Sequence, residues 1–543
     1  MTAPVIALKS TAEFPTFTAS LERAADRRDA QGVWDGGQWR GWRDLLLQAE
    51  RTAAALHRHG LRSGDVLAAQ LPNSWELLTL HAATARIGAL LLPLHSAYGV
   101  HEMASLIEQS GAVGLVARGS YRGRDRLAEL VDLRGRCATL HDIWVSQASP
   151  RSPLSPPAAA GLLDAAELMD PAGDLGPTLP PPPADPHAPL VLLASSGTTS
   201  RLPKLCVHSN GGLLGNAAAV AADGGFDATD TIVSASPLSH AFGLLSVHLA
   251  LVTGGAVGLF DGWDPARFTD TLAAASATAA FAVPAQLRDL LRLSGQRPTG
   301  LALREVRTGG APVPHELADG VRRTLGAHLI VQWGMTEIGA GTYTRPGDPP
   351  EATSTVGRPA TGAQVRVVDR SGAVAAVGET GELQYRSPYM FRGYFRAPER
   401  TRAALTADGW LRCGDLAAIG ADGSVHYRGR ADELINRGGL KFSALEVEEL
   451  LNDLPQLAQH AVIPRPDPRL GQRSCLLAAL HEGTELSLPD VVAHLTGKGL
   501  ATYKLPEQLV VVDQLPTTVT GKIARARLTS LPLLQPQPQE VGR

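Results

Sequence analysis

The sequence predicts an α/β protein built as a large N-terminal domain of layered α/β subdomains plus a β-rich subdomain, followed by a small mobile α+β C-terminal domain. Helical and strand patterns alternate up to about residue 330, which is typical of α/β layering. From about residue 355 apolar and polar residues alternate between glycine-rich turns, as in antiparallel strands. The remaining sequence mixes both patterns, so we expect domains at 1–431 and 432–543.

The first elements can be predicted one by one. Residues 40–60 have apolar positions at helical spacing and end at Gly60, a residue type that often follows a helix C-terminus. "DVLAAQL" then predicts a strand, and "SWELLTLHAATARIGA" predicts a helix that ends near Gly88. Residues 244–260 are apolar but short for a membrane span, so we expect a buried helix that runs into a strand.

Composition excludes several classes of function. The chain has 543 residues, 19% of them charged, with a net charge of −3. This balance argues against a nucleic-acid or anionic membrane partner, which would favour a basic face. Its 4 cysteines form no C-x-x-C pair, so we expect reduced thiols and no metal cluster. The first residues lack the pattern of a secretory signal, and we expect a cytoplasmic monomer or homodimer without a membrane span.

The stretch "SSGTTSRLPK" lies between two runs that predict strands, "LVLLA" and "KLCVHS". Its hydroxyl groups and backbone amides, followed by Lys204, are typical of a mobile loop that covers a polyphosphate. A hairpin turn rich in serine and threonine is the alternative. The hydrogen-bond donors to the phosphates would be Ser195, Ser196, Thr198, Thr199 and Ser200.

A second stretch, "IVQWGMTEIGAG", begins at residue 330. A strand leads to Trp333 and then to a glycine turn, and an indole beside such a turn can stack on a flat base. Thr336 and Glu337 follow, and a hydroxyl and a carboxylate can meet a phosphate and its Mg²⁺. The alternative is a core tryptophan beside a solvated glutamate.

Two further stretches lie towards the C-terminus. Asp415 follows a glycine at a strand end, where a carboxylate can accept hydrogen bonds from two ribose hydroxyls, and Arg430 is its candidate partner; a surface salt bridge is the alternative. "SALE" at residues 443–446 predicts a capping box that opens a helix. Lys522 lies in the polar turn "TVTGKIAR", where a lysine taken alone would be solvated.

Together these stretches resemble the adenylate-forming superfamily, which includes acyl- and aryl-CoA synthetases, adenylation domains of nonribosomal peptide synthetases, and luciferases. The resemblance covers nearly the whole chain and includes "LRSGDVLAAQLPNSWE", "SPLSHAFGL", "VRTGGAP", "QWGMTE", "GELQYRSPYMFRGYF", "GDLAAI" and "TGKIAR". The phosphate loop departs from the usual S-G-T-T-G-x-P-K, because Ser200 replaces the second glycine and one residue is added before Pro203. We expect ATP still to bind, since a mobile loop tolerates one insertion.

The resemblance implies that a carboxylic acid attacks the α-phosphate of Mg·ATP, and that a thiol then displaces AMP from the acyl-adenylate. Lys522 would bridge the acid and the α-phosphate, Thr336 would contact the α-phosphate and Glu337 would bind Mg²⁺. His240 is the fourth implied catalytic residue. The implied ATP and coenzyme A residues are Ser196, Gly197, Thr198, Thr199, Lys204, Gly309, Gly310, Ala311, Trp333, Gly334, Asp415, Arg430, Gly439 and Lys441.

Family members rotate the C-terminal domain after adenylation, which withdraws the lysine and presents the "RGGLK" loop to the thiol. Asp432 matches the family's hinge position. The implied acceptor is coenzyme A, and the alternative is the phosphopantetheine of a separate carrier protein. A luciferase-like oxygenase would share these motifs, and the altered phosphate loop leaves open a non-catalytic member. A hydrolase is disfavoured because we find no G-x-S-x-G motif.

The resemblance also gives an acyl pocket. Amino-acid activators carry an Asp near "HAF", which this chain lacks, and activators of hydroxybenzoates carry an Asn where it has Ala241. The wall therefore fits a small-to-medium uncharged aliphatic, alicyclic or aryl acid. Alternatively, its glycines only shape turns. The implied acyl-binding residues are His240, Ala241, Phe242, Gly243, Gly309, Gly334, Gly339 and Gly341.

Overall fold

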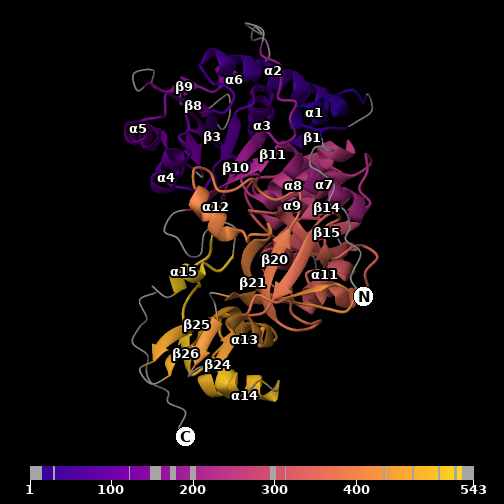
Figure 1. Ribbon diagram of the computed structural model, residues 1–543, viewed down its shortest axis with the longest axis vertical. Coiled ribbons are helices and arrows are strands. Elements are labelled where there is room, and N and C mark those ends of the chain that lie inside the picture. Colours follow the sequence, from indigo (N-terminus) through magenta and orange to yellow (C-terminus); the bar gives the residue numbers. More distant parts are fainter. Residues whose placement is uncertain are drawn as a thin grey trace.

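The computed structural model describes most of the chain and places its C-terminal elements below a larger N-terminal part (Figure 1). The described residues are 15–27, 31–121, 123–146, 161–170, 179–195, 203–293, 301–311, 313–431, 434–437, 440–467, 470–498, 500, 502–518 and 522–528.

The largest sheet has the strand order β18-β17-β16-β15-β14-β12-β13-β1-β2. Strands β12 to β16 are parallel, so the carboxyl ends of β15 and β16 lie at one edge. In open α/β sheets, ligands bind outside these carboxyl ends. The strands are β1 (Val33–Asp35), β2 (Gln38–Arg40), β12 (Thr231–Ser234), β13 (Ala256–Leu259), β14 (Ala279–Phe281), β15 (Glu305–Gly309), β16 (His328–Met335), β17 (Gly339–Tyr343) and β18 (Arg358–Pro359).

A second sheet has the order β11-β10-β4-β3-β5-β8-β9. Its strands pair in parallel except for the antiparallel pair of β10 and β11, which precede and follow the predicted phosphate loop in sequence. The strands are β3 (Val66–Gln70), β4 (Leu90–Pro93), β5 (Gly114–Arg118), β8 (Asp142–Ser146), β9 (Leu163–Asp164), β10 (Pro189–Ser195) and β11 (Lys204–Ser209), beside a small pair, β6 (Ser120–Tyr121) and β7 (Arg124–Asp125).

One buried core joins the two sheets through the helices between them. The predicted helices are present: α2 ends just before Gly60, α3 stops at Gly88 in the left-handed region, and buried α8 runs into β13. No helix in the described part of the chain is long and apolar enough to cross a membrane. The helices are α1 (Phe17–Ala25), α2 (Trp42–Arg58), α3 (Trp75–Ile87), α4 (Val100–Ser110), α5 (Leu127–Arg136), α6 (Ala166–Met169), α7 (Asn210–Gly224), α8 (Ala241–Thr253), α9 (Pro265–Ala274), α10 (Pro284–Leu293) and α11 (His315–Leu325).

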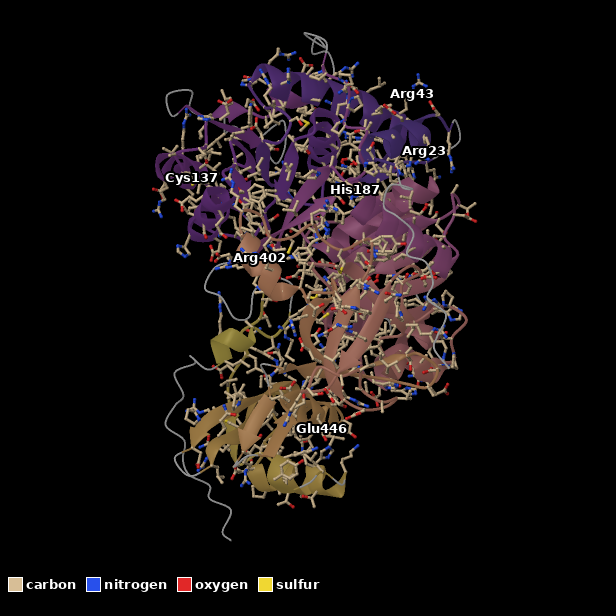
Figure 2. The ribbon with its side chains drawn as sticks, in the orientation of Figure 1. Arg23, Arg43, Cys137, His187, Arg402 and Glu446 are labelled. Atoms are coloured by element: carbon tan, nitrogen blue, oxygen red, sulfur yellow. The ribbon has the colours of Figure 1, made fainter. Side chains whose placement is uncertain are left out.

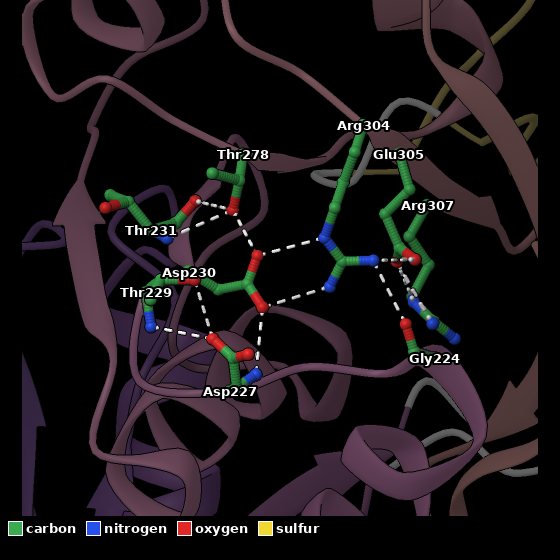
Figure 3. A network of polar contacts seen from close by, with 9 residues as sticks. All are labelled: Gly224, Asp227, Thr229, Asp230, Thr231, Thr278, Arg304, Glu305 and Arg307. Carbon is green, nitrogen blue, oxygen red and sulfur yellow. Dashed lines mark hydrogen bonds and ion pairs between the residues drawn. The ribbon is translucent and has the colours of Figure 1, made fainter.

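An ion-pair network fixes the start of β15, the strand that leads into the "TGGAP" turn (Figure 3). The Arg304 guanidinium donates to both Asp230 carboxylate oxygens, at 2.9 and 3.1 Å, and to the carbonyl oxygen of Gly224 at 3.0 Å. Its flat face lies 4.2 Å from the ring centroid of Phe226. This bidentate contact ties β15 to the end of α7 and the start of β12.

The predicted antiparallel region is confirmed as a sheet of order β19-β20-β21-β22. Asp415 on β21 lies opposite Arg430 on β22. The elements here are η3 (Pro350–Ser354), β19 (Gln364–Val368), β20 (Gly381–Arg386), α12 (Pro398–Ala404), β21 (Leu411–Ile419) and β22 (Val425–Arg430).

The C-terminal elements form a sheet of order β24-β23-β26-β25, with β27 added beside β26, around a core of their own. Ser443 caps the helix α13 as expected, but Glu446 forms an ion pair with Lys504, so the reciprocal half of the capping box is replaced. The elements are β23 (Leu434–Arg437), β24 (Leu440–Ser443), α13 (Ala444–Leu451), β25 (Leu457–Asp467), β26 (Gly471–Leu480), α14 (Leu488–Gly497), η5 (Thr502–Lys504), β27 (Gln508–Val511) and α15 (Arg525–Leu528). Figure 1 shows α15 between this sheet and the N-terminal part.

Candidate active site

The carboxyl ends of β15 and β16 carry glycines at positions where neighbouring backbone approaches closely. Gly309 pairs with Gln332 across the two strands, and a Cβ at Gly309 would lie 2.3 Å from the carbonyl oxygen of Gln332. A Cβ at Gly334 would lie 2.0 Å from the carbonyl oxygen of Gly339. These glycines are therefore required by the close approach of neighbouring backbone.

Lys522 reaches this edge from the C-terminal part of the chain. A Cβ at Gly310 would lie 2.6 Å from Cε and 2.7 Å from Nζ of Lys522, so the lysine passes directly over the glycine. Lys522 is exposed when the whole residue is considered. Its ammonium is nevertheless surrounded by protein, and this burial lowers the pKa of the ammonium, whereas the Asp415 carboxylate acts to raise it. The ammonium thus lies beside Gly310, which follows β15, and within electrostatic range of the Asp415 carboxylate.

Asp415 joins two other residues that the sequence assigns to the nucleotide. The Trp333 indole Nε1 donates to Asp415 Oδ2 at 2.8 Å, and the Arg430 guanidinium donates to Oδ1 at 3.1 Å. Asp415 is 5% exposed and Trp333 is 7% exposed, so this contact is not the surface salt bridge that the sequence left as an alternative. Stacking of Trp333 on adenine stays a prediction.

Glu337 is buried rather than solvated, and its carboxylate is held by a residue that the sequence analysis did not single out. The Tyr394 hydroxyl donates to Glu337 Oε1 at 2.8 Å, while the Lys204 ammonium lies 5.0 Å from the centre of the Tyr394 ring. Burial and the nearby carboxylate raise the pKa of Tyr394, which keeps its hydroxyl protonated. Tyr394 lies in the quoted motif "RGYF", but a motif does not reveal which side chain it faces.

The turn that carries Thr336 is tied to the strand after the phosphate loop. His208 on β11 lies with Nε2 2.7 Å from the carbonyl oxygen of Thr336. Burial lowers the pKa of His208 to about 4, and a neutral ring that donates from Nε2 satisfies this contact. No pattern in the sequence identifies His208 as part of the site.

His240 precedes α8 and lies beside a second imidazole, that of His95, with 5.5 Å between the ring centroids. Burial lowers the pKa of His240 to about 3, with smaller contributions from His95 and Lys522, so its ring is neutral. His240 Nε2 is buried and has no hydrogen-bond partner among the described residues. A buried ring nitrogen of this kind is suited to a polar group of a ligand.

The glycines predicted to line the acyl wall are packed against protein atoms. A Cβ at Gly243 would lie 2.1 Å from the carbonyl oxygen of Pro237, and one at Gly339 would lie 2.6 Å from Asn216 Oδ1. The amide of Asn216 in turn pairs with both backbone groups of Ala340, at 2.9 Å each. The space beside Gly341 is also filled, by side chains within 3 Å. Close packing accounts for these glycines, which differs from the alternative that they only shape turns, and their contact with the acyl group stays a prediction.

The first turn of α8 contributes an aromatic surface. Phe242 stacks on Phe281 of β14, with ring centroids 5.3 Å apart and an angle of 17° between planes. The guanidinium of Arg307 lies 5.8 Å from the Phe281 ring and is neutralised by Glu305, 3.1 Å away. Ala241, which precedes Phe242, has a methyl side chain and therefore no polar atom to offer a substrate.

Several of the predicted residues lie outside the described residues: Ser196, Gly197, Thr198, Thr199, Ser200, Asp432 and Gly439. Lys441 is described only through its backbone in β24, and Ala311 is exposed directly after Gly310.

Comparison with known proteins agrees with this geometry. The family described as AMP-binding enzyme matches residues 18–395, and the family described as AMP-binding enzyme C-terminal domain matches residues 446–522. The chain is 36% identical over 513 residues to a salicylyl-CoA synthase / salicylate adenylyltransferase from Streptomyces sp, covering 92% of this chain and 90% of that protein.

A second relative is the salicyl-AMP ligase / salicyl-S-ArCP synthetase of Mycobacterium tuberculosis, 32% identical over 94% of this chain and 89% of that protein. Among solved structures, ATP-bound MatB from Rhodopseudomonas palustris superposes with a TM-score of 0.82 at 26% identity, over 94% of this chain and 98% of that one. The chain belongs to the AMP-binding enzymes of the adenylate-forming superfamily, and it is an AMP-forming acid–thiol ligase that activates a carboxylic acid as its adenylate.

Proposed function

We propose that the chain is an acid–CoA ligase for a simple aryl acid, with alicyclic and small-to-medium aliphatic acids as weaker substrates. The position of Lys522 over Gly310 carries the proposal, because an ammonium at the edge of β15 can hold two anionic reactants together. The stacked pair of Phe242 and Phe281 favours a flat acyl group. The relatives named for salicylate support the aryl class.

In this proposal Lys522 bridges the substrate carboxylate and the α-phosphate of ATP while negative charge shifts towards pyrophosphate. Thr336 contacts the α-phosphate, and the neutral ring of His240 faces the acyl group. Trp333 stacks on the adenine, and Asp415 with Arg430 binds the ribose, beside the turn of Gly309, Gly310 and Ala311. Catalysis is then mainly positioning and charge neutralisation.

The residues present fit a magnesium ion. Glu337 offers a buried carboxylate, and the Tyr394 hydroxyl donates a hydrogen bond to one of its two oxygens. Among the described residues, no side chain donates a hydrogen bond to the second oxygen, which can bind a cation. Mg²⁺ commonly binds one or two carboxylates together with substrate phosphates and water. When bound, it would neutralise charge on the phosphates, and Lys204 would contact the same phosphates from β11.

Coenzyme A is the proposed acceptor, in line with the synthase named among the relatives. A second candidate acceptor is a separate carrier protein, because another relative is named as the synthetase of a carrier-bound salicyl group. In either case the loop that contains Gly439 and Lys441 would face the incoming thiol, with Asp432 as the hinge.

Pyrophosphate exchange across a panel of acids tests the proposal. The panel contains benzoate, salicylate, cyclohexanecarboxylate and the linear C4 to C8 acids, and each active acid is then assayed with CoA and with a phosphopantetheinylated carrier protein. We expect benzoate-type acids to give the highest kcat/KM and CoA to accept the acyl group. Highest activity with linear acids would overturn the aryl assignment, and transfer to the carrier alone would overturn the CoA assignment.

Lys522→Ala tests the proposed role of the lysine. Loss of a group that stabilises developing charge costs on the order of 10²–10³ in rate. We expect that loss in adenylation, with thioester formation from a supplied acyl-adenylate preserved. Equal loss in both half-reactions would contradict the proposed role.

A further inference from the structure

Lys522 belongs to a short hairpin whose described residues, 516–518 and 522–524, pair with each other. Thr517 pairs with Ile523 as an isolated bridge, and Thr518 exchanges two hydrogen bonds with Lys522, one at 2.6 Å between backbone groups and one at 3.2 Å to the threonine hydroxyl. Ile523, the residue after Lys522, is partly buried and packs against the apolar cluster that contains Leu515 and Leu528. The position of the ammonium over Gly310 therefore depends on what fixes the base of this hairpin.

Arg525, three residues after Lys522, supplies a polar attachment for this base beside the apolar packing of Ile523. Its guanidinium forms an ion pair with Glu448 of α13 and donates to the carbonyl oxygen of Val462 on β25 at 3.3 Å. Glu448 is 7% exposed, and its other oxygen accepts the Val462 backbone amide at 2.6 Å. The guanidinium and the carboxylate thus clamp the two backbone groups of one strand residue.

We propose that Arg525 is a positioning residue for the adenylation half-reaction, acting through Lys522. This inference rests on the proposed role of Lys522. Three residues of chain span at most about 10 Å, so a shift at Arg525 is transmitted directly to the turn that carries the ammonium. A displacement of about 1 Å of a catalytic group can cost about 10²-fold in rate.

The contacts of the clamp given above all join residues of the C-terminal part of the chain. Glu448 lies on α13 and Val462 lies in β25. The ion pair of Arg525 with Glu448 therefore holds the hairpin to the sheet of the C-terminal part. Rotation of this part after adenylation would carry the whole clamp with it. Thioester formation, which does not use Lys522, should therefore be insensitive to the loss of Arg525.

Both half-reactions of Arg525→Ala should be measured in the full-length enzyme with the acid that proves most active. We expect single-turnover adenylation at enzyme excess to fall about 30- to 100-fold, and thioester formation from supplied acyl-adenylate to change less than about 3-fold. Arg525→Lys, which keeps the charge but lacks the planar fork, should recover part of the adenylation rate. Equal losses in both half-reactions would indicate a merely structural role and overturn the proposal.

A double mutant separates action through Lys522 from a general effect. In a Lys522→Ala background, adding Arg525→Ala should change the residual adenylation rate less than about 2-fold, because the group being positioned is already absent. A further loss similar to that of the single variant would overturn the proposal. If Lys522→Ala itself spared adenylation, the proposed role of the lysine would fail; if only Arg525→Ala spared it, the inference alone would fail.

Glu446→Gln is the matched control. Glu446 lies on the same helix, is labelled on the C-terminal part in Figure 2, and pairs with Lys504 rather than with the hairpin. Loss of this pair should leave both half-reactions within about 2-fold of the wild type. Should Arg525→Ala fail to fold, Glu448→Gln replaces it, because its amide oxygen still accepts the Val462 amide while the charge of the clamp is lost. Adenylation by Glu448→Gln at the wild-type rate would likewise overturn the proposal.

Discussion

Gly310→Ala should separate the two half-reactions. The added Cβ would lie 2.6 Å from Cε and 2.7 Å from Nζ of Lys522, whereas carbon atoms pack comfortably at about 3.5–4.0 Å. The end of the lysine is flexible, so it can retreat, and the retreat needed is about 1 Å. A catalytic group displaced by about 1 Å can lose about 10²-fold in rate. We therefore expect adenylation to fall by about 10²-fold while thioester formation from supplied acyl-adenylate is preserved.

The substitution also has a backbone cost, which needs its own control. Gly310 has φ +83°, and an alanine in this left-handed region costs roughly 1–2 kcal/mol. Gly409 has φ +81° with no atom within 4 Å of its missing Cβ, so Gly409→Ala carries the same strain without a contact to Lys522. Both variants should show a similar fall in melting temperature.

Pyrophosphate exchange reports adenylation, and release of AMP from a supplied acyl-adenylate with thiol reports the second step. Adenylation by Gly310→Ala within 3-fold of the Gly409→Ala rate would refute the reasoning, since Lys522 would then tolerate a methyl group at the position it occupies. Equal loss in both steps would refute it too, because a general disturbance of the site would explain it.

Three further predictions concern the residues around the phosphates and the base. Tyr394→Phe removes the hydroxyl that donates to Glu337 and should raise the Mg²⁺ concentration for half-maximal adenylation about 10-fold, which a magnesium titration measures. Trp333→Phe leaves Asp415 without its indole donor and should raise the KM for ATP about 3- to 10-fold with a smaller effect on the KM for the acid. His208 has a folded-state pKa of about 4 because of burial, below its ordinary 6.5. The unfolded chain therefore binds the proton first, so the stability that His208 provides is complete above pH 6.5 and falls by about 2 kcal/mol by pH 5. Melting curves should show a shallower loss of stability over this range for His208→Asn.

Each of these has a clear contrary result. An unchanged magnesium requirement in Tyr394→Phe would mean that the Glu337 carboxylate needs no donor. Equal rises in the KM for ATP and for the acid would place the Trp333 effect outside the nucleotide site. A pH slope of melting temperature that is the same with and without His208 would assign the acid sensitivity to other groups.

The sequence predicted the long elements and the motif residues because those leave local signals. Apolar spacing marked α2 and α3, and Gly88 stops α3 where a left-handed residue is required. Alternation within the β-rich sheet placed Asp415 and Arg430 on strands, but only Arg430 lies at a strand end, whereas Asp415 lies in the middle of β21 because that strand continues to Ile419. The position of Lys522 over Gly310 agrees with the role that the resemblance implied.

The supporting contacts could not be predicted in the same way. Tyr394 reaches Glu337 across 57 positions, and His208 reaches the backbone of Thr336 across 128. No spacing rule connects side chains that approach only after several sheets have packed. The close packing around the predicted acyl-wall glycines was likewise not predictable, since a glycine in sequence does not distinguish space for a ligand from close contact with another strand.

Three charged side chains converge where the base, ribose and phosphates would lie: the ammonium of Lys522, the guanidinium of Arg430 and the carboxylate of Asp415. Their sum is one surplus positive charge. In the proposed function, the Asp415 carboxylate is the counter-ion of Lys522 before the nucleotide binds, and added salt should weaken this attraction. The polyphosphate would then replace Asp415 as the partner of the lysine, so the same ammonium would be paired with an anion both before and after substrate binds.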